Sequence, residues 1–428
     1  MDVLPDTARC DGGRLSIAGV DALELAERFG TPLYVYDEAT LRSRARAYLS
    51  GLEAYPGRSR VAFACKAQTA VAVLSVLREE GLGADVASAG ELAFALAADM
   101  PGERLVVHGN NKSDADLEAA VRAGAGLVVL DAPEEAGRLD AVAAAAGVVQ
   151  RVLVRVTPGI TAGGHTKIIT GHHGSKFGMS PVEALELVES AARMAHVQAV
   201  GLHVHLGSQV ADLSPFLEAV AWLVEFLDDH GLGDLPVLDL GGGLGIAHTD
   251  QEQALEPQQA VETVCEVLTD GLLAHALPLP ELVLEPGRSI AGPAGVTLYR
   301  VGTVKRAADG TVYAAVDGGM SDNPRPAMYG ARYQAVVADR ADRPPFATYS
   351  LVGKHCESGD VLIEHAELPE LHRGDVVAIA ATGAYNSTMA STYNAVPRPA
   401  AVMVAGGEAR VVVERETVAG LLAREVGG

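Results

Sequence analysis

Between residues 60 and 285 the chain repeats one pattern of apolar and polar positions. A short run of β-branched and other apolar residues is followed by a turn of small residues, and then by a stretch whose apolar residues recur every three or four positions. The short runs are typical of buried strands, and the longer stretches are typical of amphipathic helices. The predicted strands are VAFACK (61–66), ADVAS (84–88), RLVVHG (104–109), GLVVLDA (126–132), RVLVRV (151–156), AVGLHVHLG (199–207), PVLDLGG (236–242) and ELVLEPG (281–287).

Strands of this kind that alternate with helices predict a parallel sheet. The predicted helices include SPVEALELVESAARM (180–194) and LSPFLEAVAWLVEFLDDHG (213–231), and several begin near a capping residue, namely Ser113, Asp114 or Ser180. Eight units in about 225 residues fit a TIM-type (β/α)8 barrel, whose usual length is about 250 residues. The alternative is an open doubly wound sheet, but GGGLG at 241–245 lacks the GxGxxG spacing that such sheets use for dinucleotides.

From about residue 295 the pattern changes to strands separated by turns, which predicts an all-β domain of the sandwich or barrel type. The runs that carry this prediction are GVTLYRVGTV, GTVYAAVDGG, DVLIEHAEL, DVVAIAATG, AAVMVAG and EARVVVERE. Near the N-terminus, RLSI and PLYVYD have strand character and ALELAERFG has helix character. We therefore expect residues 1–35 to join the β domain, residues 36–290 to form the barrel, and residues 291–428 to form the β domain.

Composition narrows the class of protein. Apolar residues make up 49% of the 428 residues and charged residues 21%, which indicates a globular chain with a large core. A net charge of −22 argues against nucleic acid, because phosphate binding needs clustered lysine and arginine. No uncharged apolar run of 18 residues predicts a membrane span, and the N-terminal residues lack a signal-peptide pattern, so we expect a cytoplasmic protein. Cys10, Cys65, Cys265 and Cys356 lack CxxC spacing, which favours reduced thiols over disulfides or a zinc site.

One of only six lysines, Lys66, lies at the end of a strand predicted to be buried. An ammonium group is strongly hydrated and is rarely buried without a partner. The side chain could extend along the strand end so that its amine reaches water. Alternatively, the amine could act as a nucleophile. The residues at the other strand ends bear on this choice.

Polar residues gather where the predicted strands end, and in a barrel the carboxyl ends of the strands carry the active site. These residues are Lys66, Asp85, Ser88, His108, Asn110, Arg155, His203, His205, Gly241–Gly243, Glu285 and Arg288. Strand ends with a purely structural role would not be expected to collect a lysine, several histidines, two arginines and a glutamate. The collection predicts an active site.

Each part of this collection suits one part of a pyridoxal phosphate site. GGGLG exposes backbone N–H groups to an anion, although alone it is more typical of a tight turn. Ser208 adds a hydroxyl and Arg288 a fixed cation. A lysine forms the Schiff base with such a cofactor, and a carboxylate such as Glu285 keeps the pyridine nitrogen protonated. His203, His205 and Glu285 could instead hold a metal, but positions i and i+2 of one strand do not provide an open three-ligand set, so we expect no metal.

Eight motifs occur in order along the chain: ACKA, ADVASAGEL, GLHVHLGSQ, LDLGGGLG, EPGRSIAG, VDGGMSDN, GKHCESGD and ATGAY. From about residue 30 to residue 425 the chain resembles the diaminopimelate decarboxylases. The resemblance implies pyridoxal 5'-phosphate as cofactor, and a barrel-plus-β-domain fold shared with alanine racemase and eukaryotic ornithine decarboxylase.

The resemblance also implies roles for individual residues. Lys66 matches the Schiff-base lysine, His205 the imidazole that stacks on the pyridine ring, and Glu285 the partner of the ring nitrogen, with His203 as a support. Further cofactor contacts are implied for Ser208, Gly241, Gly242, Gly243, Gly287, Arg288 and Tyr385. Substrate contacts are implied for Arg288, Arg325, Tyr329, Glu357 and Tyr385.

The HCESGD motif (355–360) lies far along the chain from Lys66. In the family, this cysteine and glutamate enter the active site of the other subunit, which implies a homodimer with shared sites and Cys356 as the proton donor. A free cysteine is more often a small buried apolar residue, but histidine, glutamate and aspartate flank this one.

The implied reaction is the decarboxylation of meso-2,6-diaminopimelate to L-lysine and carbon dioxide. The same chemistry on ornithine, lysine, arginine or a carrier-bound substrate is an alternative. An alanine racemase is disfavoured by HCESGD, and a non-catalytic cofactor-binding regulator by the presence of Lys66, Glu285 and Cys356. Two segments depart from the family: AQTA after Lys66, where many relatives have an asparagine- and proline-containing turn, and the loop 161–180, which in the family helps to cover the active site.

Overall fold

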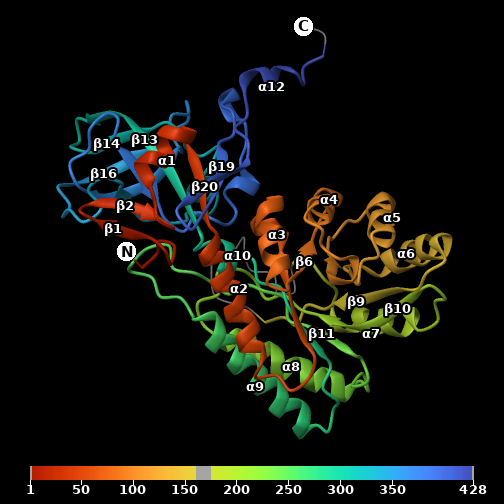
Figure 1. Ribbon diagram of the computed structural model, residues 1–428. Helices are drawn as coiled ribbons and strands as arrows, with labels where there is room; N and C mark the ends of the chain where they lie inside the picture. Colours follow the sequence, from red (N-terminus) through yellow and green to blue (C-terminus); the bar gives the residue numbers. More distant parts are fainter. Residues whose placement is uncertain (1, 161–174, 427–428) are drawn as a thin grey trace. The chain divides into compact units, whose positions relative to one another are not determined.

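The computed structural model describes residues 2–160 and 175–426 and divides into two compact units (Figure 1). The barrel unit comprises Arg42–Ile246 and Ala254–Ser289. The β unit comprises Met1–Leu41, Ala247–Gln253 and Ile290–Gly428.

The barrel unit contains a closed ring of eight parallel strands in the order β10-β11-β12-β5-β6-β7-β8-β9. The strands are β5 (Ser59–Ala64), β6 (Gly83–Val86), β7 (Leu105–Val107), β8 (Leu127–Leu130), β9 (Gln150–Arg155), β10 (Val197–His203), β11 (Val237–Asp239) and β12 (Glu281–Leu284). All eight correspond to predicted strands, and the predicted barrel is confirmed. The open-sheet alternative is wrong because β12 pairs with β5 and closes the ring.

Apolar side chains from seven of the eight strands, all but β6, form the core cluster that fills the barrel, which is why the strands appear as nearly continuous apolar runs. They are Ala62, Val106, Leu127, Val129, Leu153, Val200, Val237 and Val283. In β10, Gly201 is required by packing, since a Cβ there would lie less than 3.0 Å from the carbonyl oxygen of Val237. The filled interior leaves the ends of the barrel for chemistry.

Helices surround these strands (Figure 1). They are α2 (Glu38–Leu52), α3 (Val71–Glu79), α4 (Ala89–Ala97), α5 (Asp114–Arg122), α6 (Pro133–Ala146), α7 (Pro181–Ala191), α8 (Ser214–Asp229) and α9 (Pro257–Ala274). Ser113 and Ser180 each form a capping box with the residue three positions later. Asp114, which we also considered as a cap, is instead the first residue of α5. None of the helices in residues 2–160 and 175–426 is both long enough and apolar enough to span a membrane.

The β unit is built on a nine-stranded sheet with the order β17-β16-β14-β13-β4-β19-β20, to which β18 is added beside β13 and β15 beside β18. The strands are β4 (Leu33–Asp37), β13 (Gly295–Arg306), β14 (Val312–Val316), β15 (Ala335–Val337), β16 (Ala347–Val352), β17 (Val361–Leu368), β18 (Val376–Ile379), β19 (Ala400–Ala405) and β20 (Glu408–Val413). A small sheet of β1 (Arg9–Asp11), β2 (Arg14–Ile17) and β3 (Val20–Asp21), with helices α1 (Ala22–Phe29), α10 (Arg288–Ala291), α11 (Arg325–Tyr329) and α12 (Val418–Leu422), completes the named elements.

Strand β4 explains why the N-terminal segment belongs with residues far along the chain. It is antiparallel to β13 and parallel to β19, so it lies inside the sheet rather than at its edge. Strand β13 supports two apolar cores: Val296 and Leu298 contribute to one, and Tyr299 and Val301 to the other. The alternation of side chains along a strand places these pairs on opposite faces.

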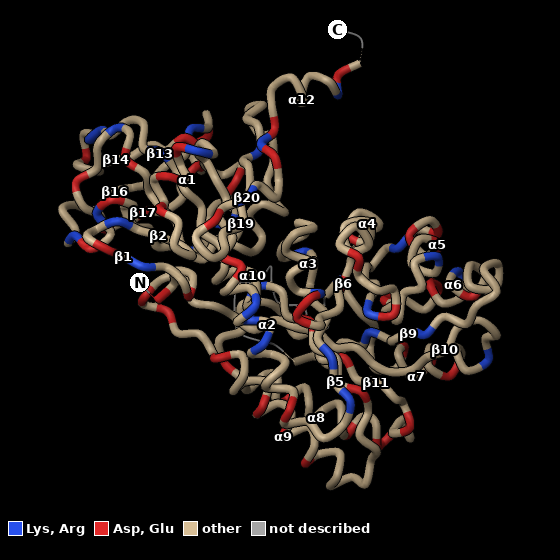
Figure 2. The backbone as a smooth tube through the Cα atoms, viewed as in Figure 1, with Lys and Arg blue, Asp and Glu red and all other residues tan. Residues whose placement is uncertain are grey.

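The segment 247–253 belongs to the β unit, although it lies within the range 36–290 that the sequence assigns to the barrel. Its side chains bond to the β unit: His248 accepts a hydrogen bond from Arg325 Nη1 at 2.9 Å, and Asp250 is bonded to Gln334. In both units, Lys and Arg positions are interspersed with acidic positions along the described residues (Figure 2).

Candidate active site

Lys66 lies just beyond β5, on a 3-10 turn formed by Cys65–Ala67. Its side chain is 44% exposed, and its Nζ lies 2.9 Å from Oδ2 of Asp85, which is buried in β6. The neighbours Cys65 and Ala67 are fully buried and fix the turn. The amine therefore extends from a rigid support to a buried carboxylate, rather than simply into water.

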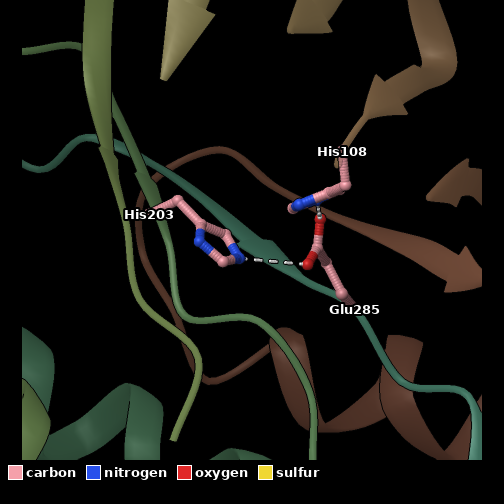
Figure 3. Close-up of side chains that lie close together, drawn as sticks. All are labelled: His108, His203 and Glu285. Carbon is pink, nitrogen blue, oxygen red and sulfur yellow. Dashed lines mark hydrogen bonds and ion pairs between the residues drawn. The ribbon is translucent and has the colours of Figure 1, made fainter. Parts of the chain in front are cut away.

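Glu285 follows β12 and is held by two histidines (Figure 3). His108 Nε2 donates to Glu285 Oε1 at 2.6 Å, and His203 Nε2 donates to Oε2 at 3.2 Å. All three side chains are buried, and they come from the ends of three different strands. His108 Nε2 is also 3.8 Å from Asp85 Oδ1, so Lys66, Asp85, His108, Glu285 and His203 form one contiguous chain of polar side chains.

The two histidines favour the ionised form of Glu285. Burial raises the pKa of Glu285, but the charge of His108 and hydrogen bonds from both histidines outweigh burial, so the pKa lies well below its usual range. Burial lowers the pKa of His203 to about 3, so its ring is neutral and donates through Nε2. Burial and the charge of Glu285 raise the pKa of Asp239 well above its usual range. Glu285 is thus a fixed buried anion, and Asp239 carries the proton of that pair.

His205 presents a neutral ring. Its Nδ1 accepts a hydrogen bond from the backbone N–H of Gly242 at 3.2 Å. Burial lowers its pKa well below the usual range, and the cations Lys66 and Arg155 lower it further. A flat, uncharged imidazole of fixed orientation is suited to stack on an aromatic ring.

The glycine loop after β11 excludes side chains. Gly241 and Gly243 have φ values of +63° and +121°, which favour glycine. A Cβ on Gly242 would lie less than 3.0 Å from the carbonyl oxygen of Glu285, and one on Gly243 equally close to that of Gly207. The loop therefore places no side chain between its backbone and an anion, while the N–H groups of Gly241 and Gly242 donate to Asp239 Oδ1 at 2.8 Å and to His205 Nδ1 at 3.2 Å.

Ser208 and Arg288 add side-chain donors to the barrel-unit site. Arg288 is buried, and its Nη2 donates to Ser208 Oγ at 2.8 Å. Gly287, just before it, packs so tightly that a Cβ there would lie 3.0 Å from those of Ala64 and Ala67. The segment after Glu285 thus passes directly against the turn that carries Lys66.

These residues fit a pyridoxal phosphate: an amine on a rigid turn, a glycine loop with a hydroxyl and a guanidinium for the phosphate, a neutral ring and a buried anion. A metal would use some of the same atoms, since His108, His203 and Glu285 offer ligand atoms within 4.8 Å of one another. In this structure both carboxylate oxygens of Glu285 accept histidine hydrogen bonds.

The predicted residues of the β unit form a separate set. Arg325 begins α11 and is buried, and its Nη1 donates to Tyr333 Oη at 2.7 Å as well as to His248. The His248 ring also donates a hydrogen bond to Glu252, and this bond lowers the pKa of Glu252 to about 2. Tyr329 ends α11 and is half-buried. The guanidinium is therefore held in place by neighbours that leave its positive charge intact.

The HCESGD turn exposes Cys356 and Glu357 between β16 and β17. Asp360 organises the turn: its carboxylate accepts from the backbone N–H of Met320 at 2.6 Å and of His355 at 2.8 Å. Tyr385 is half-buried and has a φ of +60°, a conformation that tyrosine seldom adopts. Of the loop 161–180, residues 161–174 lie outside the described residues.

The sequence predicts His108 and Asp85 at strand ends without indicating a role for either. The structure assigns His108 to Glu285 and Asp85 to Lys66. The available signal was their polarity at the end of apolar strands, which indicated the site but not the partners.

Fold and site together define a barrel enzyme in which a lysine amine and a glycine loop lie at the carboxyl ends of the strands. The family model described as "Pyridoxal-dependent decarboxylase, pyridoxal binding domain" matches residues 38–292. The diaminopimelate decarboxylase of Bacillus subtilis is 43% identical over 95% of this chain and 93% of its own. That of Corynebacterium efficiens is 46% identical over 98% and 93%. The crystal structure of the M. jannaschii enzyme in complex with L-lysine has a TM-score of 0.91 at 33% identity, over 99% of this chain and 98% of that one.

The chain belongs to the pyridoxal-dependent decarboxylases and, within them, to the diaminopimelate decarboxylase family.

Proposed function

We propose that the protein decarboxylates meso-2,6-diaminopimelate to L-lysine and carbon dioxide with pyridoxal 5'-phosphate as cofactor. The observation that carries the proposal is the contiguous chain from Lys66 through Asp85 and His108 to Glu285, beside a glycine loop that excludes side chains. Relatives with this named activity match nearly the full length of the chain.

When bound, the cofactor supplies an electron-withdrawing ring that accepts the electron pair released with carbon dioxide. Lys66 Nζ would hold the cofactor and give way to the substrate amine, and Asp85, whose Oδ2 lies 2.9 Å from Nζ, would orient the lysine amine. Glu285 holds a proton on the ring nitrogen, and His205 covers the ring face. The phosphate is held by the glycine loop, Ser208 and Arg288, with Gly287 allowing the close approach and Tyr385 adding a hydroxyl.

We propose that the protein selects its substrate by binding the second carboxylate of that substrate. Arg325, with Arg288 and Tyr329, binds that group, while Glu357 binds the distal amine. Cys356 of the partner subunit returns a proton to the substrate carbon from Sγ. The buried Arg325, already oriented by Tyr333 and His248, is preorganised for a bidentate contact.

The proposal is tested by measuring released carbon dioxide with meso-diaminopimelate, lysine, ornithine and arginine. Substrates without the second carboxylate leave the Arg325 guanidinium unpaired, and discrimination at such polar contacts reaches about 10⁴-fold. We expect kcat/KM for lysine and ornithine to be lower by that order, and Arg325→Met to remove most of the difference. Arg343→Met, at an exposed position of the same unit, is the control and should leave discrimination unchanged.

Equal turnover of lysine or ornithine and diaminopimelate would refute the proposed substrate while leaving the chain in its family. Loss of all activity in Arg343→Met would show that substitutions in this unit disturb folding, so that a loss in Arg325→Met could not be assigned to substrate binding.

The proposed dimer with shared sites predicts complementation between two inactive variants. Lys66→Ala and Cys356→Ala are mixed under conditions that let subunits exchange. Each mixed dimer then has one site with both defects and one with neither. Random reassortment makes half of the dimers mixed, so activity should return to roughly a quarter of wild type in a symmetric dimer.

Residual activity of the Cys356→Ala protein is subtracted first, because water can replace a thiol as proton donor. Exchange is verified with differently tagged subunits. If tagged dimers form and no activity returns, Cys356 acts within its own chain or has no part in the reaction.

A further inference from the structure

A buried lysine lies behind the residues that hold Glu285. The loop from β7 to α5 begins with His108 and includes Lys112, whose side chain is 3% exposed. The Lys112 ammonium donates to the carbonyl oxygen of Gly109 at 2.6 Å and to that of Val129 at 2.7 Å, and its Nζ lies 2.7 Å from Glu135 Oε1. Two carbonyl acceptors and one carboxylate ion-pair partner thus surround the buried ammonium group.

Two side chains of α6, those of Glu135 and Arg138, hold this loop in place. Glu135, on α6, also accepts from the backbone N–H of Asp131 at 3.0 Å through its other carboxylate oxygen. The carbonyl oxygen of Lys112 itself accepts from Arg138 Nη1 at 2.8 Å. The carbonyl that Lys112 holds belongs to Gly109, the residue directly after His108. A shift of that carbonyl would move the imidazole that donates to Glu285.

Burying a charged pair inside the barrel unit costs free energy, because both groups lose their hydration. Burial lowers the pKa of the Lys112 ammonium, and the charge of Glu135 opposes that shift. The lowered pKa reflects the loss of water around the ammonium group. Apolar residues of similar volume often serve as well or better where stability alone is concerned. The pair therefore suggests a role in orientation.

We propose that Lys112 is a positioning residue: by fixing the carbonyl of Gly109, it holds His108 against Glu285 and so maintains the carboxylate that faces the cofactor ring. This inference rests on the proposed function, since it assigns Glu285 to the cofactor. It adds a residue that makes no contact of its own with Glu285 and acts through His108.

The test compares cofactor affinity in a double-mutant cycle. Lys112→Met alone would strand the Glu135 charge and destabilise the protein, so Lys112→Met/Glu135→Leu, in which both charges are replaced, is the principal variant. We expect its thermal unfolding to remain near that of wild type, while its dissociation constant for pyridoxal phosphate rises about tenfold, the lower end of what supporting residues contribute at metal sites. The visible absorption band should shift as well.

The cycle is completed with His108→Ala. If Lys112 acts through His108, the pair replacement should cost no further affinity in the His108→Ala background. The matched control is Arg60→Met/Glu281→Leu, which removes another ion pair of the barrel, at the amino ends of β5 and β12, and should leave affinity and spectrum unchanged.

Additive losses in the cycle, or wild-type affinity and spectrum in the pair variant, would overturn the proposal and leave Lys112 as a stabilising residue only. If the pair variant does not fold, Lys112→Met/Glu135→Gln, which removes the bond to Gly109 but keeps an oxygen that can accept from the N–H of Asp131, is measured in the same cycle, and unchanged affinity would equally overturn the proposal. Failure of wild-type protein to bind the cofactor would instead refute the proposed function.

Discussion

Replacing Lys66 with alanine is expected to abolish turnover and to remove the visible absorption that reports attachment of the cofactor to the protein. Lys66 Nζ lies 2.9 Å from the buried Asp85 on a rigid turn, where it is placed to attach the cofactor. Loss of a covalent nucleophile costs roughly 10⁴-fold or more in rate. The measurements are carbon dioxide release and the absorption spectrum of the purified variant.

The attachment point is determined by borohydride reduction followed by digestion and mass spectrometry, which should find the adduct on Lys66. Lys305, which lies near the Tyr313 ring in the β unit, provides the control. Lys305→Ala should keep both colour and activity. An adduct found on Lys112 or Lys176 would contradict the assignment of the site.

The barrel could be predicted from sequence because its strands are buried on both faces and therefore appear as nearly continuous apolar runs. The same property marked the site, since Lys66 and Glu285 interrupt the apolar pattern where strands end. In the β unit, β16 was not predicted. Its Thr348 is exposed and its Tyr349 buried, so its alternating pattern is weaker than an uninterrupted apolar run.

The contacts between site residues could not be predicted by the same means. His108 and Glu285 are 177 positions apart, and only closure of the barrel brings them within 2.6 Å. The segment 247–253 is likewise joined to the β unit by a hydrogen bond that the Arg325 side chain donates to His248, 77 positions away. A pattern of apolar residues predicts elements and their ends, whereas these pairs depend on three-dimensional closure.

Replacing Glu285 with glutamine should leave the cofactor bound but lower the rate by several orders of magnitude. A neutral amide cannot hold a proton on the ring nitrogen, and that proton makes the ring an effective electron acceptor. The structure adds a second cost. His108 and His203 both donate to Glu285, whereas glutamine offers one oxygen and one N–H₂ group, so one histidine would face a donor.

His203 is poorly placed to adapt to that change. In the part of the chain that the structure describes, its buried Nδ1 has no hydrogen-bond partner, so moving the ring proton to Nδ1 would leave a buried donor unsatisfied. Glu285→Asp keeps the charge and serves as the comparison: it should lose less activity than the glutamine variant, although its shorter side chain cannot reach both histidines equally. Carbon dioxide release and cofactor content are measured for both variants. Turnover near wild type in Glu285→Gln, with full cofactor content, would reduce Glu285 to a structural residue and remove the central element of the proposed mechanism.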